Sequence, residues 1–140
     1  MTGRESGYSL IELVGVLALL GILAAVGLSR FTSTETFAAR GFYDEAANFL
    51  RYAQKQAIAR HGAVAVQLIG NGLSLQGAPG PAGEAPYQIA APGGVSLAAT
   101  VSSLSFDALG RPSTAAVFTF TEQDGLVRSL TVHAETGYVQ

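Results

Sequence analysis

The 140-residue sequence contains no cysteine, and only 13% of its residues are charged. The absence of cysteine excludes disulfides, thiol chemistry and cysteine-ligated metal sites. It leaves the compartment open, because an extracytoplasmic domain can fold without disulfides. The formal net charge is −2, so we expect no general attraction to nucleic acid or to acidic membrane surfaces.

Residue patterns typical of catalysis are also lacking. His61 and His133 are far apart in the sequence, and neither belongs to an HxxxH or HExxH pattern. There is no GxSxG nucleophile elbow, and the glycines of residues 77–83 lack the lysine and following helix of a phosphate-binding loop. Asp107 and Asp124 fall in expected turns without the closely spaced carboxylates of a calcium site. We therefore expect no enzyme activity, no metal site and no cofactor.

The longest apolar run covers residues 8–28, and Glu12 is its only charged residue. As a helix, these roughly 21 residues would extend about 32 Å, close to the roughly 30 Å hydrocarbon core of a bilayer. A lone carboxylate costs about 2.5–3.5 kcal/mol at mid-depth in a membrane and somewhat less near its edge. Glu12 is therefore expected to have a partner.

Three interpretations of this N-terminal region are open. A secretory signal peptide would have a basic start, a short apolar stretch and a small-residue cleavage site, for which Ala25-Val26-Gly27 is a weak candidate. The apolar run is long for such a peptide, and Glu12 interrupts its start. A plain transmembrane anchor would explain the length of the run but not the carboxylate. The third interpretation rests on a short motif.

Residues 7–14 read GYSLIELV. A glycine, a glutamate five residues later and an immediate long apolar run resemble the class III signal of type IV pilins and type II secretion pseudopilins. The resemblance implies that residues 1–7 are a leader, that prepilin peptidase cleaves after Gly7, and that it methylates the new N-terminus at Tyr8. It also implies that Glu12 is the assembly glutamate of that family.

This assignment gives the carboxylate of Glu12 a partner. Cleavage after Gly7 leaves an ammonium group at Tyr8, and in a bundle of such helices Glu12 can meet the terminal ammonium of a neighbouring subunit. Paired charges are tolerated in apolar surroundings where single charges are not. Because the contact is head-to-tail and does not close, it would propagate as a helical filament.

After residue 28 the periodicity first becomes that of an amphipathic helix. Residues 29–61 carry an apolar stripe at helical spacing. At residues 60–62, a cationic last turn is followed by Gly62, which can adopt a left-handed φ and is typical of a helix end. The predicted core stripe consists of Phe42, Ala46, Phe49 or Leu50, Ala53 and Ala57.

From residue 62 onward the pattern predicts antiparallel strands. The expected strands cover residues 63–69, 73–76, 95–98, 101–106, 116–121, 126–133 and 138–139. Residues 77–94 hold four of the five prolines and are expected to form an irregular surface loop. The sequence therefore predicts an α+β fold, in which one helix from about residue 8 to about residue 61 packs on a small antiparallel β-sheet domain of residues 62–140.

Three segments after the apolar run refine the family resemblance. FDALGRP at residues 106–112 is similar to a turn of GspH/FimT-like minor pilins. Residues 52–58 followed by Gly62 resemble the helix end of these proteins, and TGYV at residues 136–139 resembles their closing strand. The chain thus resembles a minor pilin or pseudopilin of a type IV pilus, an MSHA-type pilus or a type II secretion system.

The resemblance implies a structural subunit with one helix in the inner membrane and its C-terminal domain in the periplasm, incorporated into a pilus or pseudopilus. The implied partners are prepilin peptidase, other major and minor pilins or pseudopilins, and the inner membrane. Two alternatives stay open, a minor pilin that binds DNA during uptake and a monomeric membrane-anchored periplasmic binding module. Nucleic acid is not expected as a partner, because Arg111 and Arg128 are the only Lys or Arg residues after Gly62.

Overall fold

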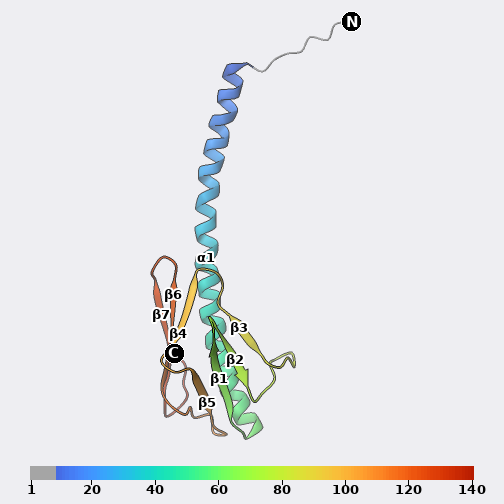
Figure 1. Cartoon of the computed structure of the whole chain (residues 1–140), viewed down its shortest axis with the longest axis vertical. Helices are drawn as coiled ribbons and strands as arrows, with labels where there is room; N and C mark the ends of the chain where they lie inside the picture. Colours follow the sequence, from blue (N-terminus) through green and yellow to red (C-terminus); the bar gives the residue numbers. More distant parts are fainter. Residues whose placement is uncertain (1–8) are drawn as a thin grey trace. The chain divides into compact units, whose positions relative to one another are not determined.

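The computed structural model describes residues 9–140, and within the helix the side chains of residues 26–36 lie outside the description. In the described part, one helix, α1 (Leu10–Arg60), precedes seven strands (Figure 1). The chain divides into two compact units, Met1–Glu35 and Thr36–Gln140, and the boundary falls within α1. The predicted helix of about residues 8–61 corresponds to α1, apart from Tyr8, which lies outside the described residues.

The end of α1 differs from the prediction in one detail. His61, not Gly62, adopts the left-handed conformation, with φ of 49°. The His61 N–H donates to the Ile58 carbonyl (N···O 3.2 Å), and the Gly62 N–H donates to the Ala57 carbonyl (3.2 Å). This pair of bonds is a Schellman motif, in which the residue before Gly62 takes the left-handed position. The prediction placed the helix end correctly but chose the wrong residue for the turn.

The predicted small antiparallel β domain consists of two sheets. The four-stranded sheet has the order β3-β2-β1-β5, formed by β3 (Gln88–Ala90), β2 (Gly72–Gln76), β1 (Val64–Ile69) and β5 (Ser103–Phe106). The three-stranded sheet has the order β4-β6-β7, formed by β4 (Val95–Ala99), β6 (Ala116–Glu122) and β7 (Val127–Val132). The strands predicted at residues 63–69 and 73–76 pair as the β1–β2 hairpin, and those predicted at residues 116–121 and 126–133 pair as the β6–β7 hairpin.

Three strand predictions need correction. Strand β3 lies inside residues 77–94, which were expected to be irregular; it pairs with β2 through Leu73 and Ile89. The strand expected at residues 101–106 begins only at Ser103. The last predicted strand, residues 138–139, is reduced to a bridge between Val132 and Val139. Strands β3 and β5 depend on pairing with β2 and β1, which lie farther back in the chain, and the last segment makes only one bridge, so local periodicity does not fix the bounds of these short segments.

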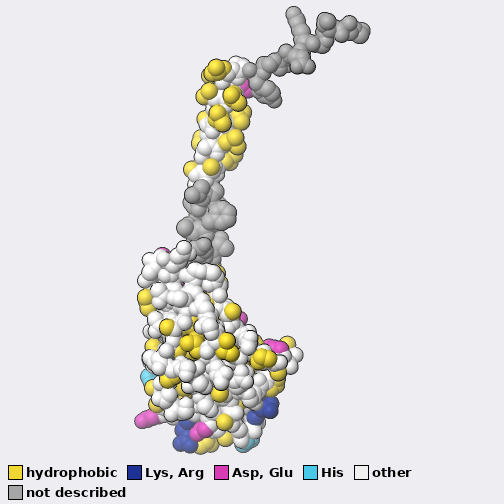
Figure 2. Space-filling model, in the orientation of Figure 1, with side chains coloured by type: hydrophobic (Ala, Val, Ile, Leu, Met, Phe, Trp, Pro, Cys, Tyr) yellow, Lys and Arg dark blue, Asp and Glu magenta, His cyan; other side chains and the backbone are white. Residues whose placement is uncertain are grey.

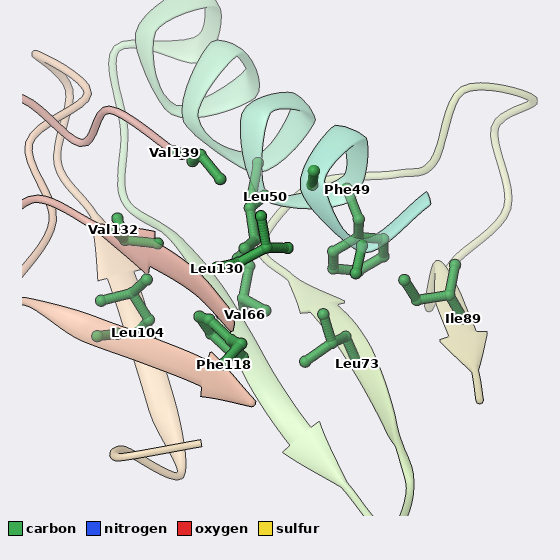
Figure 3. Close-up of a cluster of buried hydrophobic side chains, with 14 of the residues drawn as sticks. Phe49, Leu50, Val66, Leu73, Ile89, Leu104, Phe118, Leu130, Val132 and Val139 are labelled. Carbon is green, nitrogen blue, oxygen red and sulfur yellow. The ribbon is translucent and has the colours of Figure 1, made fainter. Parts of the chain in front are cut away.

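The core of the second unit lies between α1 and the two sheets (Figure 3). Phe49 and Leu50 of α1 face Val66 and Leu73 of the four-stranded sheet and Leu130 of the three-stranded sheet. All six predicted stripe residues of the helix are buried: Phe42, Ala46, Phe49, Leu50, Ala53 and Ala57. Burial also alternates along β6 as its sequence pattern predicted. The predicted α+β class is confirmed.

The side chain of Asn71, in the turn between β1 and β2, links the two sheets. Its Nδ2 donates to the Val95 carbonyl oxygen (2.6 Å), and its Oδ1 accepts a hydrogen bond from the Leu97 N–H (2.6 Å). The Asn71 carbonyl also accepts from the Ala91 N–H (2.9 Å). The amide thus bonds to the outer edge of β4 as a neighbouring strand would, and it ties the four-stranded sheet to the three-stranded one.

Replacing Asn71 by alanine is expected to lower the free energy of unfolding by about 1–3 kcal/mol, because a donor and an acceptor on β4 lose their partner. Denaturant unfolding of the full chain in detergent, followed by tyrosine fluorescence, measures the change. Asn48→Ala on the exposed side of α1 is the control and should change stability by less than about 0.5 kcal/mol. Equal losses in the two variants would contradict the link between the sheets.

Candidate assembly site

In the first unit, the described side chains form an apolar helical surface with one charge. None of the side chains of residues 9–25 is buried, and the exposed fractions of the large apolar ones range from 46% at Val16 to 79% at Leu10. Figure 2 shows these apolar side chains on the visible face of the segment. Glu12 is the only ionisable residue in this range. A helix that is apolar all round needs cover from lipid or from other helices.

The predicted processing residues, Gly7 and Tyr8, lie outside the described residues. Of the expected membrane span of residues 8–28, the side chains of residues 26–28 also lie outside the description. Within the part of the chain that the structure describes, no helix is both long enough and apolar enough to cross a membrane.

Glu12 lies in the first turn of α1. The carbonyl of Ser9 accepts hydrogen bonds from the N–H groups of Glu12 (3.0 Å) and Leu13 (3.1 Å), so Ser9 precedes the first helical residue. A carboxylate at the third helical position lies near the positive end of the helix dipole, which stabilises a helix by about 0.3–1 kcal/mol. Glu12 therefore stabilises the start of α1, and its side chain is exposed.

In the second unit, the three segments that carry the family resemblance meet at Gln54. Its Nε2 donates to the carbonyl oxygens of Gly110 (2.9 Å) and Thr136 (3.0 Å). Gly110 and Gly137 have left-handed φ values of 76° and 66°. A Cβ on Gly110 would lie 2.7 Å from Cδ1 of Ile58 on α1. These motif residues thus hold the end of the helix against two turns, which is a structural role.

Asp107 organises the turn that contains Gly110. Its Oδ1 accepts hydrogen bonds from the N–H groups of Leu109 and Arg111 (2.9 Å each), and its Oδ2 accepts from Arg111 Nε (3.2 Å). The backbone hydrogen bond from Arg111 is the main reason that the pKa of Asp107 lies below its usual value, with further contributions from the Leu109 N–H and the Arg111 charge. The carboxylate caps its own turn, as the sequence predicted.

Both arginines after Gly62 are engaged in ion pairs within the β region. Arg111 pairs with Asp107 at 3.2 Å, and Arg128 Nε pairs with Glu122 Oε1 at 3.0 Å. The Glu122 pair is the less exposed one, because the Glu122 side chain is only 6% accessible. Residues 62–140, all of which the structure describes, therefore contain no cluster of unpaired Lys or Arg residues of the kind that binds DNA phosphates.

His61 directly follows α1, and His133 directly follows β7. The ring of His133 lies 6.2 Å from that of Tyr138 and 2.9 Å from the Gln140 amide nitrogen. His61 and His133 do not meet in a common site. Among the described residues, no group of three or more potential metal ligands occurs.

A helix whose C-terminal half packs on a small antiparallel β domain defines a pilin-like subunit. The family model described as Type II transport protein GspH matches residues 44–136, and the prokaryotic N-terminal methylation motif matches residues 2–28. The chain belongs to the GspH family, which confirms the resemblance to GspH/FimT-like minor pilins.

Solved structures of two pilin-like proteins share this fold. One is the type IV minor pilin FimU of Pseudomonas aeruginosa, solved in two crystal forms, whose sequence is 24% identical to this chain. The TM-scores are 0.57 and 0.56, and both matches cover 74% of this chain. They cover 84% and 88% of the two FimU chains. The minor pseudopilin EpsH of the Vibrio cholerae type 2 secretion system is 15% identical, with a TM-score of 0.54, covering 75% of this chain and 93% of that one. No curated protein sequence matches the chain.

Proposed function

We propose that the chain is a structural, non-enzymatic minor subunit of a type IV pilus or a type II secretion pseudopilus. The observation that carries this proposal is the helical segment of residues 9–25, whose apolar side chains are exposed around a single carboxylate. The β domain buries its own core, whereas this segment needs cover from outside the chain. The inner membrane provides that cover before assembly, and the helices of other pilins or pseudopilins provide it in the filament.

The proposed maturation begins with cleavage after Gly7 by prepilin peptidase and methylation of Tyr8. The helix of residues 8–28 holds the subunit in the inner membrane with the β domain in the periplasm. On assembly, the carboxylate of Glu12 pairs with the Tyr8 ammonium of a neighbouring subunit, so neither charge stays alone in apolar surroundings. The match to the N-terminal methylation motif supports the first of these steps.

Leader cleavage separates this proposal from a membrane-anchored module that is not a pilin. When the full chain is co-expressed with an active prepilin peptidase, its intact mass should fall by residues 1–7 and rise by one methyl group. Co-expression with a catalytically inactive peptidase is the matched control and should leave the mass unchanged. An unchanged mass with the active peptidase would contradict the pilin assignment.

A further inference from the structure

The second unit carries a groove that the assembly helix does not explain. It lies between α1 and the segment that leads to β3, and its volume is about 460 Å³. Residues of α1 form one wall, and the segment that precedes β3 forms the other. The groove is lined by Gly41, Asp44, Glu45, Asn48, Pro81 and Tyr87, among others. All of these residues belong to the same unit.

A fixed aromatic cluster joins the two walls of the groove. The ring of Tyr87 lies 4.8 Å from that of Phe49, tilted by 31°, and 5.9 Å from that of Tyr52, edge to face. The Tyr52 hydroxyl donates to the Pro79 carbonyl oxygen at 2.8 Å, which ties the segment to α1. Aromatic contacts of this geometry stabilise a fold beyond the burial of apolar area. The half-buried ring of Tyr87 is therefore held in place before any ligand arrives.

The α1 wall of the groove also carries two carboxylates. Asp44 and Glu45 are exposed on α1, and neither makes an ion pair with another described residue. Burial raises the pKa of Tyr87, and the nearby charges of Glu45 and Glu84 raise it further. The groove thus combines an aromatic face with carboxylates, which is the chemistry that binds an ammonium or guanidinium group.

Gly41 gives the groove an open end. It lies in the interior of α1, where glycine is less favourable than alanine. Apart from its chain neighbours and the adjacent helix backbone, a Cβ at this position would meet no atom within 4 Å. The φ of Gly41 is not left-handed, so the fold itself does not require glycine there. From Gly41 to Tyr52 the helix rises about 16 Å, enough for roughly five residues of an extended segment.

We propose that this groove binds an extended segment of a different pilin-like subunit that carries an arginine or lysine side chain. The cation lies against the ring of Tyr87 and pairs with Asp44 and Glu45, and the backbone of the segment passes close to Gly41. A second copy of this chain does not supply such a segment. Arg111 and Arg128 are already ion-paired, and its cations at residues 40, 51, 55 and 60 lie on α1, not on an extended segment. The partner's presence beside the groove rests on the proposed assembly role.

A peptide titration tests the chemistry of the groove without any filament. The probe is acetyl-Gly-Gly-Arg-Gly-Gly-amide, added to the isotopically labelled full chain in detergent micelles. It should shift the NMR signals of residues 41–52 and of Tyr87, and high salt should weaken the effect. The Asp44→Asn/Glu45→Gln variant should raise the Kd about fivefold, whereas the matched Asp124→Asn/Glu135→Gln control should not. Equal shifts with a control peptide in which glutamate replaces the arginine, or an unchanged Kd in the groove variant, would overturn the proposal.

Cross-linking tests the occupant. A photoreactive amino acid at Asn48 is introduced into the full chain in cells that assemble the filament, and the linked peptide is identified by mass spectrometry. A link to a different subunit, at a segment containing arginine or lysine, supports the proposal. A link to a second copy, a link to a segment without a cation, or no link in filaments that contain the chain would overturn it. Absence of the chain from filaments would instead contradict the proposed function. In that case the peptide titration still tests whether the groove binds a cationic segment.

Discussion

Glu12→Ala is expected to leave membrane insertion and leader cleavage intact and to abolish incorporation of the chain into filaments. Without the carboxylate, the terminal ammonium of the neighbouring subunit stays unpaired among apolar helices. Removing one partner of a buried ion pair costs about 3–5 kcal/mol, which is more than a hundredfold in an assembly equilibrium. Immunoblots of sheared filaments and of washed membranes measure incorporation and insertion separately.

A comparison of magnitudes and two further variants distinguish charge pairing from a loss of helix stability at the N-terminus of α1. The favourable position of Glu12 near the helix N-terminus contributes only about 0.3–1 kcal/mol, so its loss alone does not prevent assembly. Glu12→Asp, which keeps the charge, should restore part of the incorporation, whereas the nearly isosteric Glu12→Gln should restore none. Wild-type incorporation of Glu12→Ala or Glu12→Gln would refute the pairing with Tyr8.

Sequence periodicity predicted the parts of the fold that depend on local patterns. The apolar stripe of α1 is buried as expected because a helix that packs on one side must repeat its apolar residues every three to four positions. The β1–β2 and β6–β7 hairpins follow because their turns lie within a few residues of both strands. In these elements the pairing partners are close in sequence, so the local signal suffices.

Pairing between distant segments was not predictable in the same way. Strand β4 pairs with β6, and β5 pairs with β1, across long separations; no periodicity in β4 or β5 specifies those partners. The prolines before and after β3 predicted a loop, yet pairing with β2 orders three residues between them. The link from Asn71 to β4 was missed for the same reason, because an asparagine between two glycines is equally typical of an ordinary hairpin turn.

The candidate sites also divide into those marked by adjacent residues and those formed by residues far apart in the sequence. The motif of residues 7–14 pointed to Glu12 because its features are adjacent in the sequence. The groove at Tyr87 combines residues of α1 with a segment about forty positions later, and only the fold brings them together. Similarly, the resemblance marked the stretches around Gln54, Gly110 and Gly137 separately, and the structure shows that they form one contact.

That contact leads to the largest expected effect on stability, from Gly137→Ala. Gly137 has a φ of 66°, and a Cβ added there would lie 2.5 Å from both the Gly110 carbonyl oxygen and Gln54 Nε2. The substitution combines left-handed strain with overlap against a backbone atom, so we expect a loss of about 3–5 kcal/mol in the free energy of unfolding. Denaturant unfolding of the full chain in detergent, followed by tyrosine fluorescence, measures it.

Gly125→Ala separates strain from overlap. Gly125 also has a left-handed φ, 85°, but a Cβ there would meet nothing within 4 Å, so we expect only the conformational cost of about 1–2 kcal/mol. Equal losses at the two positions would show that the turn at Gly137 moves away from Gly110. Adding Gln54→Ala to Gly137→Ala should recover little stability, because the side chain of Gln54 can move aside whereas the Gly110 carbonyl is fixed by its turn. A large recovery would instead identify Gln54 as the group that requires glycine at this position.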